Sequence, residues 1–263
     1  MAYKKYIDVS YWQGDIDWTK VKNEVDGVII RAGYGQNNID KKFKEYISEC
    51  NRLGIPCGVY WFSYAYTVAM AKKEAEYCLA AIKPYKVELP VCFDFEYDSV
   101  DKAKAKGITI TKTLATNMVH AFCGAVEAAG YYAMNYTNMD YLNKYFDDST
   151  LKYDLWLAQW PTKPNLDNPP EGVGIWQYSS KGSVSGIKGD VDMDAAYKDY
   201  TAIIAKAGLN GLAKTEEKTK EKEPWYAEAQ KWVVAKGISD GTKPNTPVTF
   251  AEVWDMLYKM NGK

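Results

Sequence analysis

The stretch LPVCFDFEYD, residues 89–98, decides how the rest of the chain is interpreted. It begins as a buried strand, and two carboxylates then interrupt the apolar run. Side chains alternate along an extended chain, so Asp94 and Glu96 project to one face and Phe93 and Phe95 to the other. Two acids on a buried strand are costly because desolvation and mutual repulsion both oppose ionisation. The pair favours chemistry in which one acid holds a proton beside a charged neighbour, as glycoside hydrolysis requires. A strand with one wet face, or a salt-bridged pair, is the alternative.

Strand and helix patterns alternate on both sides of this stretch. Apolar segments predict further strands at 5–9, 27–31, 56–62, 131–136, 154–159, 174–178 and 189–193. Amphipathic periodicity predicts helices at 17–22, 41–53, 68–82, 111–129 and 139–145, and the last three strands are joined by links without such periodicity. Alternation implies parallel strands with right-handed crossovers. We therefore predict an α/β fold, a TIM-like (β/α)5(β)3 barrel. An open doubly wound sheet competes with it, but no G-x-G-x-x-G follows the first strand.

The barrel is expected to fill residues 1–208, and the remainder differs in composition. The run 214–223 contains only Lys, Glu and Thr, which predicts a solvated linker at 209–223. Residues 224–263 carry two amphipathic helical patterns, marked by Trp225, Ala229, Trp232 and Val233 and by Val253, Trp254, Leu257 and Tyr258. About forty residues seldom bury enough surface to be stable alone. This small C-terminal helical domain is therefore expected to dock on the barrel, to self-associate or to bind a polymer.

The composition argues against several kinds of site. Basic and acidic groups nearly balance, 33 against 34, so no surface for nucleic acid or an anionic membrane is indicated. The five cysteines are odd in number and lack C-x-x-C spacing, which predicts reduced core residues. The single histidine, His120, cannot build a multi-histidine zinc site, and no metal or cofactor is expected. The aromatic content, 14% with 22 Tyr and 9 Trp, favours a carbohydrate substrate, because these rings present flat apolar faces with polar edges.

The N-terminal residues lack the apolar segment of a signal peptide, and no later run is long enough to span a bilayer. The sequence therefore predicts synthesis in the cytoplasm without membrane insertion. A role outside the cell would then need lysis or another exit.

Acidic residues recur where the predicted strands end. The reactive groups of a parallel barrel gather at the C-terminal ends of its strands. The first and last strands of a closed barrel are neighbours, so acids at their ends should approach one another. Asp190 and Asp194 alternate in phase with Asp192, and geometry alone excludes neither. The candidates at the strand ends are Asp8, Asp94, Glu96 and Asp192.

These residues carry a resemblance to glycoside hydrolase family 25, the N-acetylmuramidases found in bacterial autolysins and phage endolysins. The resemblance follows an ordered set of motifs: DVSYWQGDIDW at 8–18, IRAGYG at 30–35, GVYWFSYA at 58–65, DFE at 94–96, WLAQ at 156–159, WQYSS at 176–180 and VDMD at 191–194. One departure is Asp194, which stands where Asn is more usual. Because a wall-directed enzyme without an export signal is typical of a phage endolysin, we expect this chain to be endolysin-like.

The resemblance implies cleavage, with retention, of the β-1,4 bond between N-acetylmuramic acid and N-acetylglucosamine in peptidoglycan. Glu96 resembles the general acid, and Asp8, Asp94 and Asp192 resemble the supporting carboxylates. An ionised Asp94 would raise the pKa of Glu96. Asp94 would then orient the substrate's N-acetyl group as internal nucleophile or attack directly, and both remain open.

Polar and aromatic residues near the predicted strand ends are candidate sugar contacts, with burial in the core or a place on the rim as the alternative. The candidates are Tyr60, Trp61, Tyr64, Tyr136, Trp156, Gln159 and Gln177. Arg31 is a further candidate, because a guanidinium on an interior strand needs a carboxylate, supplied by the protein's acids or by muramic acid.

The tail, from Trp232 to Tyr258, resembles a single S-layer-homology repeat, although Phe250 replaces the usual Arg before Ala-Glu. Wall binding and homo-oligomerisation through this module are both expected alternatives. Two other functions stay open for the whole chain: a chitinase-like hydrolase of N-acetylglucosamine polymers, and a non-catalytic cell-wall-binding protein.

Overall fold

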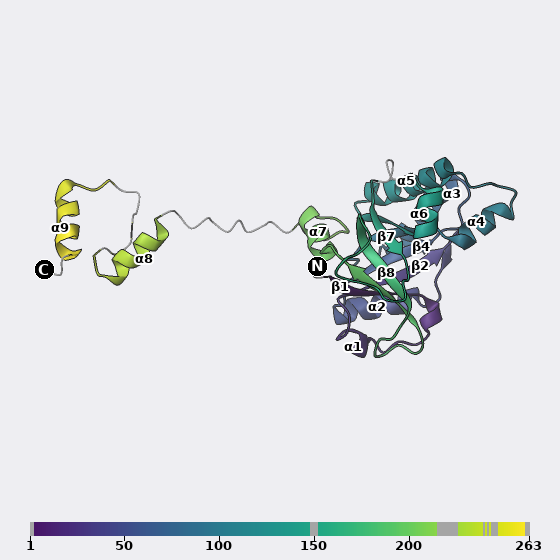
Figure 1. Ribbon diagram of the computed structural model, residues 1–263, viewed down its shortest axis with the longest axis horizontal. Coiled ribbons are helices and arrows are strands. Elements are labelled where there is room, and N and C mark those ends of the chain that lie inside the picture. Colours follow the sequence, from purple (N-terminus) through teal and green to yellow (C-terminus); the bar gives the residue numbers. More distant parts are fainter. Residues whose placement is uncertain are drawn as a thin grey trace. The chain divides into compact units, whose positions relative to one another are not determined.

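A computed structural model of the protein describes residues 3–147, 152–214, 226–238, 240, 242 and 247–260. The chain divides into two compact units, Met1–Thr215 and Glu216–Lys263 (Figure 1). Of the linker predicted at 209–223, residues 215–223 lie outside the described residues, as does Trp225.

The first unit is built on a sheet that closes on itself. Its strands, in hydrogen-bonded order, are β1 (Lys4–Val9), β9 (Val191–Ala196), β8 (Val173–Gly182), β7 (Asp154–Ala158), β6 (Ala133–Asn138), β5 (Val91–Asp94), β4 (Cys57–Phe62) and β2 (Gly27–Tyr34). Pairing between β1 and β2 closes the barrel, and β3 (Asn38–Ile39) only extends β2 as a hairpin. Within the described residues, the predicted eight-stranded barrel is confirmed.

The last strand runs against the others, which the strand pattern did not predict. Six strand pairs of the barrel are parallel: β1–β2, β2–β4, β4–β5, β5–β6, β6–β7 and β7–β8. Strand β9 is antiparallel to both of its neighbours, β8 and β1. The reason is the short link after β8, because a parallel return requires a longer crossover. Asp192 therefore lies at the start of its strand and not at the end. This start reaches the same end of the barrel as the C-terminus of β1, where Asp8 pairs directly with Asp192.

Helices cover the outside of the parallel part of the barrel (Figure 1). They are α1 (Trp18–Val21), α2 (Phe43–Leu53), α3 (Val68–Ile82), α4 (Tyr97–Lys104), α5 (Lys112–Ala128) and α6 (Met139–Tyr145), with a 3-10 turn η1 (Tyr11–Gln13). The last helix of the first unit, α7 (Tyr200–Ala207), follows β9 and packs Tyr200 and Ile204 against the residues inside the barrel. Gly54 ends α2 in the left-handed region, at φ 70°, where glycine has no steric penalty. Neither α4 nor α7 was predicted. The strand expected to reach Glu96 ends at Asp94, and Glu96 is instead the N-cap of α4.

Strand alternation divides the buried residues into an inner and an outer core. The inner core fills the barrel and includes Tyr6, Tyr60, Cys92, Tyr136 and Trp156. The outer core lies between the barrel and the helices, and its members come from the opposite faces of the same strands. All five cysteines are free and buried, as predicted.

The end of the first unit differs from the predicted boundary at residue 208. Leu209 and Leu212 pack against the inner core, and Asn210 is buried. The Asn210 side chain accepts a hydrogen bond from Tyr132 N at 2.8 Å and donates one to Leu89 O at 3.0 Å. These residues therefore plug the barrel at the end where β5 and β6 begin, and they belong to it.

The second unit contains the two predicted helices, α8 (Ala227–Ala235) and α9 (Phe250–Met260). Large apolar side chains stay exposed on α9: Phe250, Trp254, Leu257, Tyr258 and Met260. No helix among the described residues of either unit is long and apolar enough to cross a membrane.

A buried acid, Glu74 on α3, holds the loop that follows β4. Its carboxylate accepts hydrogen bonds from Ser63 Oγ at 2.6 Å, Tyr64 N at 3.1 Å and Gln36 Nε2 at 3.2 Å. Burial raises the pKa of Glu74 to about 7, and the hydrogen bonds oppose that rise. The folded protein therefore binds the proton of Glu74 more tightly than the unfolded chain does.

We expect Glu74→Gln to flatten the pH dependence of stability. A raised pKa stabilises the fold fully below about pH 4.5, and this contribution is lost as the pH rises through about 7. The loss amounts to about 3 kcal/mol at most. Glutamine resembles the protonated acid and does not titrate. The free energy of unfolding of the Glu74→Gln variant should therefore fall less between about pH 5 and pH 8 than that of the unmodified protein. Urea unfolding at both pH values measures this, with the exposed Glu76→Gln on the same helix as control. Equal pH dependence in Glu74→Gln and the unmodified protein would contradict the assignment.

Candidate active site

The four predicted acids come together at one end of the barrel. Asp8 ends β1 next to Asp192 of β9, and Asp94 is the last residue of β5. The charge of Asp94 acts on Asp8, and the charge of Asp192 acts on Glu96, so the two sides of the barrel mouth face one cleft. Asp8 and Asp94 are 5% and 3% exposed, whereas Glu96 and Asp192 are half-buried. Glu96 is therefore the member of the Asp94 pair that a substrate can reach.

Local structure fixes the backbone of Glu96. Glu96 N donates to Ser99 Oγ at 3.1 Å in a capping box that starts α4. Ser99 Oγ in turn donates to Ser63 O at 2.6 Å, and Ser63 N donates to Asp94 O at 2.8 Å. Because Glu74 anchors Ser63, the loop after β4 ties the positions of Asp94 and Glu96 together.

A second network fixes Asp8. Gln177 Nε2 donates to Asp8 Oδ2 at 2.8 Å. Gln177 Oε1 accepts from Tyr136 Oη at 3.2 Å and from Trp160 Nε1 at 3.1 Å. The Tyr136 hydroxyl also acts on Glu96, whose pKa it lowers, so this side chain interacts with both sides of the cleft.

Burial dominates the electrostatics of the Asp94–Glu96 pair. It raises the pKa of Glu96 to about 7, and the hydrogen bonds with Asp94 and Tyr136 act in the lowering direction. Burial, followed by the charge of Glu96, raises the pKa of Asp94 well above its usual range. The predicted cause, the negative charge of Asp94, was therefore wrong. The pair is stable when it shares one proton across the hydrogen bond between the two carboxyls.

The predicted sugar contacts divide according to the face of the strand on which they lie. Tyr60 and Tyr136 point into the barrel beneath the acids and are 9% and 6% exposed. Trp61 was a wrong prediction: it points to the outer core, is 0% exposed and donates from Nε1 to Gly35 O. Strand alternation makes this necessary, because Tyr60 and its neighbour cannot face the same side.

Three further candidates differ from one another in exposure. Trp156 is 1% exposed and packs between Tyr60 and Tyr136, so it forms the floor of the site and not a surface for sugar. Gln159 is exposed on the rim after β7, where its backbone carbonyl accepts a hydrogen bond from Trp176 Nε1. Gln177 is buried and acts through Asp8, as described above.

Comparisons with known proteins assign most of the first unit to a family. Residues 7–187 match the family described as Glycosyl hydrolases family 25. The chain belongs to glycosyl hydrolase family 25. The protein is therefore a glycoside hydrolase.

Three similar proteins illustrate the range of this family. The family 25 chain is 28% identical over 210 residues to Lysozyme M1 of Streptomyces globisporus, which covers 76% of this chain and 70% of that protein. It is 29% identical over 198 residues to the autolytic lysozyme of Clostridium acetobutylicum, covering 72% and 55%. The structure of the modular autolysin LytC from Streptococcus pneumoniae has a TM-score of 0.65 and 32% identity, covering 74% and 47%. The chain spans about half the length of the last two proteins.

In this family 25 barrel, Arg31 forms an ion pair with Asp40 of the protein itself. Its Nε and Nη2 both lie 2.8 Å from Asp40 Oδ2, and its guanidinium packs over the rings of Tyr11 and Tyr34. Arg31 lines a pocket of about 360 Å³ beside the acids, together with Tyr11, Trp12, Tyr34, Phe62, Tyr64 and Asp98. Tyr64 is thus placed at the cleft as predicted, whereas Arg31 shapes the pocket wall through its pair with Asp40.

Several exposed aromatic residues at this end of the barrel were not predicted. Trp160 is 57% exposed and is tied to Asp8 through Gln177, and Trp12 is 73% exposed on η1. The signal for Trp160 was its place directly after Gln159, at the end of a predicted strand. Exposed tryptophans beside buried acids are suited to stack on sugar rings.

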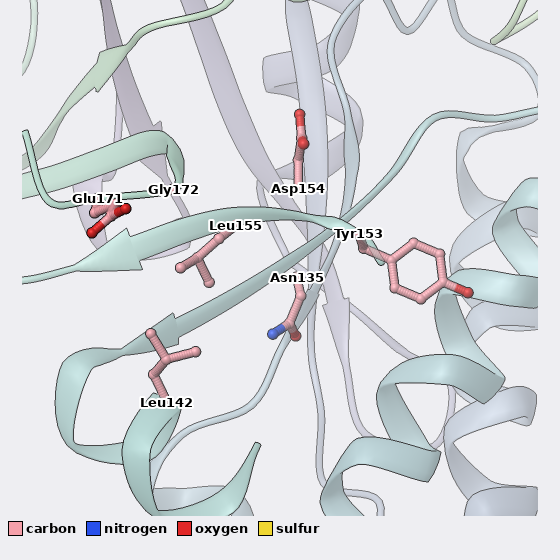
Figure 2. A pocket seen from close by; sticks show the side chains of 7 residues that line it. All are labelled: Asn135, Leu142, Tyr153, Asp154, Leu155, Glu171 and Gly172. Carbon is pink, nitrogen blue, oxygen red and sulfur yellow. The ribbon is translucent and has the colours of Figure 1, made fainter. Parts of the chain in front are cut away.

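A second pocket lies away from the acids, on the outer side of β6 and β7 (Figure 2). It measures about 310 Å³ and is lined by Asn135, Leu142, Tyr153, Asp154, Leu155, Glu171 and Gly172. Asn135 is buried, and its amide atoms have no hydrogen-bond partner among the described residues. Asp154 on its border is already bound by Lys198, Tyr132 and Tyr200. The pocket holds none of the acids of the candidate active site.

Proposed function

We propose that the protein is a peptidoglycan hydrolase that cleaves the β-1,4 bond between N-acetylmuramic acid and N-acetylglucosamine, with retention of configuration. The observation that carries this proposal is the Asp94–Glu96 pair at the end of β5, which faces Asp8 and Asp192 at the mouth of a family 25 barrel. Only Glu96 of the pair is substantially accessible from the cleft.

Glu96 is the proton donor in this proposal. A pKa of about 7 keeps a large share of Glu96 protonated near neutral pH, as a general acid requires. Proton transfer to the glycosidic oxygen lets the leaving sugar depart, and Glu96 then takes a proton from the attacking water. When the proton of the pair is on Glu96, the Asp94 carboxylate is ionised, and it then orients the substrate's N-acetyl group as internal nucleophile or attacks the anomeric carbon itself.

Asp8 and Asp192 together carry a negative charge near neutral pH, because the pKa of Asp192 is about 6, and this charge faces the positive charge that develops on the sugar ring. Their direct pairing across β1 and β9 places both at the seam opposite β5. Burial first, and the neighbouring charges second, raise the pKa of Asp8 well above its usual range, and burial raises that of Asp192 to about 6. Anions fixed in a partly dry cleft favour an oxocarbenium ion more strongly than anions in water do.

Release of reducing sugars from defined polymers tests this function. Purified peptidoglycan should be digested, whereas chitin oligomers of N-acetylglucosamine should be cleaved far more slowly. Digestion of chitin at an equal rate would favour the chitinase-like alternative. Binding to walls without released sugar would favour a non-catalytic wall-binding protein. Proton NMR of the first product reports the anomeric configuration, and an inverted product would contradict retention.

We further propose that the second unit is an S-layer-homology-like module of an endolysin-like enzyme that acts on the bacterial wall. The exposed aromatic side chains of α9, Phe250, Trp254 and Tyr258, offer a surface for wall polymer or for a second copy. A chain that ends at Lys214 keeps all the described residues of the first unit, including Asn210 and its hydrogen bonds to Tyr132 and Leu89.

Truncation separates the two units experimentally. The chain ending at Lys214 should digest purified peptidoglycan at the rate of the full chain, because the acids all lie in the first unit. It should bind intact walls more weakly in sedimentation assays, or lose an oligomer seen by light scattering. Unchanged wall binding together with an unchanged mass would refute a role for the module.

A further inference from the structure

We propose that Trp160 is a positioning residue: its indole N–H fixes the side-chain amide of Gln177, and Gln177 in turn holds the carboxyl of Asp8 in place. This inference rests on the proposed function, because Asp8 is given its part in the reaction there. It assigns a role to an exposed side chain that carries no acid and that the four-acid account does not use.

The side-chain amide of Gln177 has three polar partners. Its Nε2 donates to Asp8 Oδ2 at 2.8 Å. Its Oε1 accepts from Trp160 Nε1 at 3.1 Å and from Tyr136 Oη at 3.2 Å. Gln177 is buried, and a buried amide depends on protein partners for its hydrogen bonds. These three contacts therefore decide which way the amide faces.

Of the two donors to Gln177 Oε1, Trp160 is the one that distinguishes the amide oxygen from the amide nitrogen. An indole N–H can only donate, so it binds the oxygen and opposes the NH₂ group. The Tyr136 hydroxyl can donate or accept, and it can therefore meet either atom. With Oε1 held by Trp160, Nε2 faces Asp8 as a donor. Without the indole N–H, Asp8 alone opposes a flipped amide, and its own side chain loses part of its restraint.

The backbone just before Trp160 is anchored to β8, the strand that carries Gln177. Ala158, the last residue of β7, pairs with Gln177. Gln159 N then donates to Gln177 O at 3.1 Å, and Gln159 O accepts from Trp176 Nε1 at 2.8 Å. Strand pairing therefore brings the indole within reach of the Gln177 amide before any substrate binds.

Trp160 connects the open side of the cleft with a buried acid. Its side chain is 57% exposed, whereas Gln177 and Asp8 are 3% and 5% exposed. A sugar ring that packs on the exposed indole face would hold the indole, and with it the N–H, in one position. Occupancy of this face and the orientation of Asp8 are then linked through two hydrogen bonds. Loss of the N–H should therefore affect kcat and not only KM.

Two substitutions separate the N–H of Trp160 from its ring. Trp160→Phe keeps an aromatic face but has no donor. We expect kcat on soluble peptidoglycan fragments to fall by roughly fivefold, as for the loss of one hydrogen bond between neutral groups, and KM to change by less than about threefold. Trp160→Leu also removes the ring, so it should raise KM in addition. An unchanged kcat in Trp160→Phe would overturn the proposal.

A double-mutant cycle with Gln177→Met tests whether Trp160 acts through Gln177. Methionine keeps the approximate length of the side chain and removes the amide. We expect Gln177→Met alone to lose roughly 10²-fold in kcat, the cost of a misplaced catalytic group. Adding Trp160→Phe should lower kcat by no more than about a further twofold, because the amide that the N–H fixes is absent. A further loss as large as that in the presence of Gln177 would overturn the proposal.

Trp12→Phe is the matched control for this cycle. Trp12 is another strongly exposed tryptophan at this end of the barrel, and within the described residues it has no hydrogen bond with Gln177. Whatever its own effect on kcat, Trp12→Phe should change kcat by the same factor with and without Gln177→Met. A dependence on Gln177 as strong as that of Trp160→Phe would contradict a specific link through Trp160.

A measurement without substrate separates this proposal from the proposed function. In proton–nitrogen NMR spectra of the full chain, the side-chain amide of Gln177 is identified by its loss in Gln177→Met. Exchange of its protons with water should become roughly fivefold faster in Trp160→Phe, because the amide is no longer held on Asp8, and should stay unchanged in Trp12→Phe. Faster exchange in a protein that cleaves no peptidoglycan would leave the positioning assignment standing and refute the proposed function. Unchanged exchange in Trp160→Phe would show that the assignment is wrong.

Discussion

Replacing Glu96 with glutamine is expected to lower kcat/KM on peptidoglycan by roughly 10³-fold, because the variant cannot donate a proton to the leaving sugar. The substitution keeps the size of the side chain, and the capping box uses the backbone N–H of this residue. It also removes one acid from a buried pair, so the free energy of unfolding near pH 8 should not fall. Initial rates of reducing-sugar release and urea unfolding measure the two effects.

The control for Glu96→Gln is Asp101→Asn, which removes an exposed acid from the same helix, α4. We expect this control to retain activity within a factor of about two, since a solvated charge one helical turn away acts weakly on the cleft. Near-normal activity of Glu96→Gln in a folded protein would show that another group donates the proton.

Asp94→Asn is expected to cost roughly 10²-fold to 10³-fold in kcat/KM and to move the alkaline limb of the pH profile to lower pH. In the unmodified pair, the last proton leaves against the charge of an ionised partner. With asparagine at position 94, the second titrating carboxyl of the pair is gone, so the alkaline limb follows Glu96 alone, whose pKa burial holds above the usual range. The remaining activity is therefore confined to more acidic solution.

The direction of this shift distinguishes two hypotheses for Asp94: that it shares a proton with Glu96, or that its role is purely structural. Asp94 O accepts from Ser63 N through the backbone, so the substitution leaves that contact in place. A variant that loses activity equally at every pH would mean that Asp94 and Glu96 titrate independently. A shift of the alkaline limb to higher pH would contradict the coupling directly.

Several features of this site can be predicted from two sequence patterns, the alternation of strands and helices and the period of two along a strand. Alternation of strands and helices predicts a closed barrel, and a closed barrel brings its first and last strands together. For that reason the sequence alone predicts Asp8 and Asp192 as neighbours, and the pairing of β1 with β9 confirms it. The period of two along a strand likewise places Asp94 on an interior face.

Other features depend on tertiary contacts that a single sequence does not display. The direction of β9 is set by its pairing with β1 and β8, and its apolar pattern is the same in either direction. Alternation shows that Tyr60 and Trp61 face opposite sides of the strand. Which of them faces the outer core is decided by tertiary packing, here the contact of Trp61 with Tyr77 of α3. Burial of the acids also depends on the whole barrel, so the main cause of the raised pKa of Glu96 could not be predicted locally.

The identity of the new reducing ends in digested peptidoglycan tests the central claim most directly. Purified peptidoglycan is digested with the full chain, its free reducing ends are converted to sugar alcohols with borohydride, and the alcohols are identified after hydrolysis, with Glu96→Gln as the blank. Cleavage by the proposed route predicts that the alcohol of muramic acid accumulates with digestion and is absent from the blank. Accumulation of the alcohol of glucosamine instead would contradict the muramidase assignment.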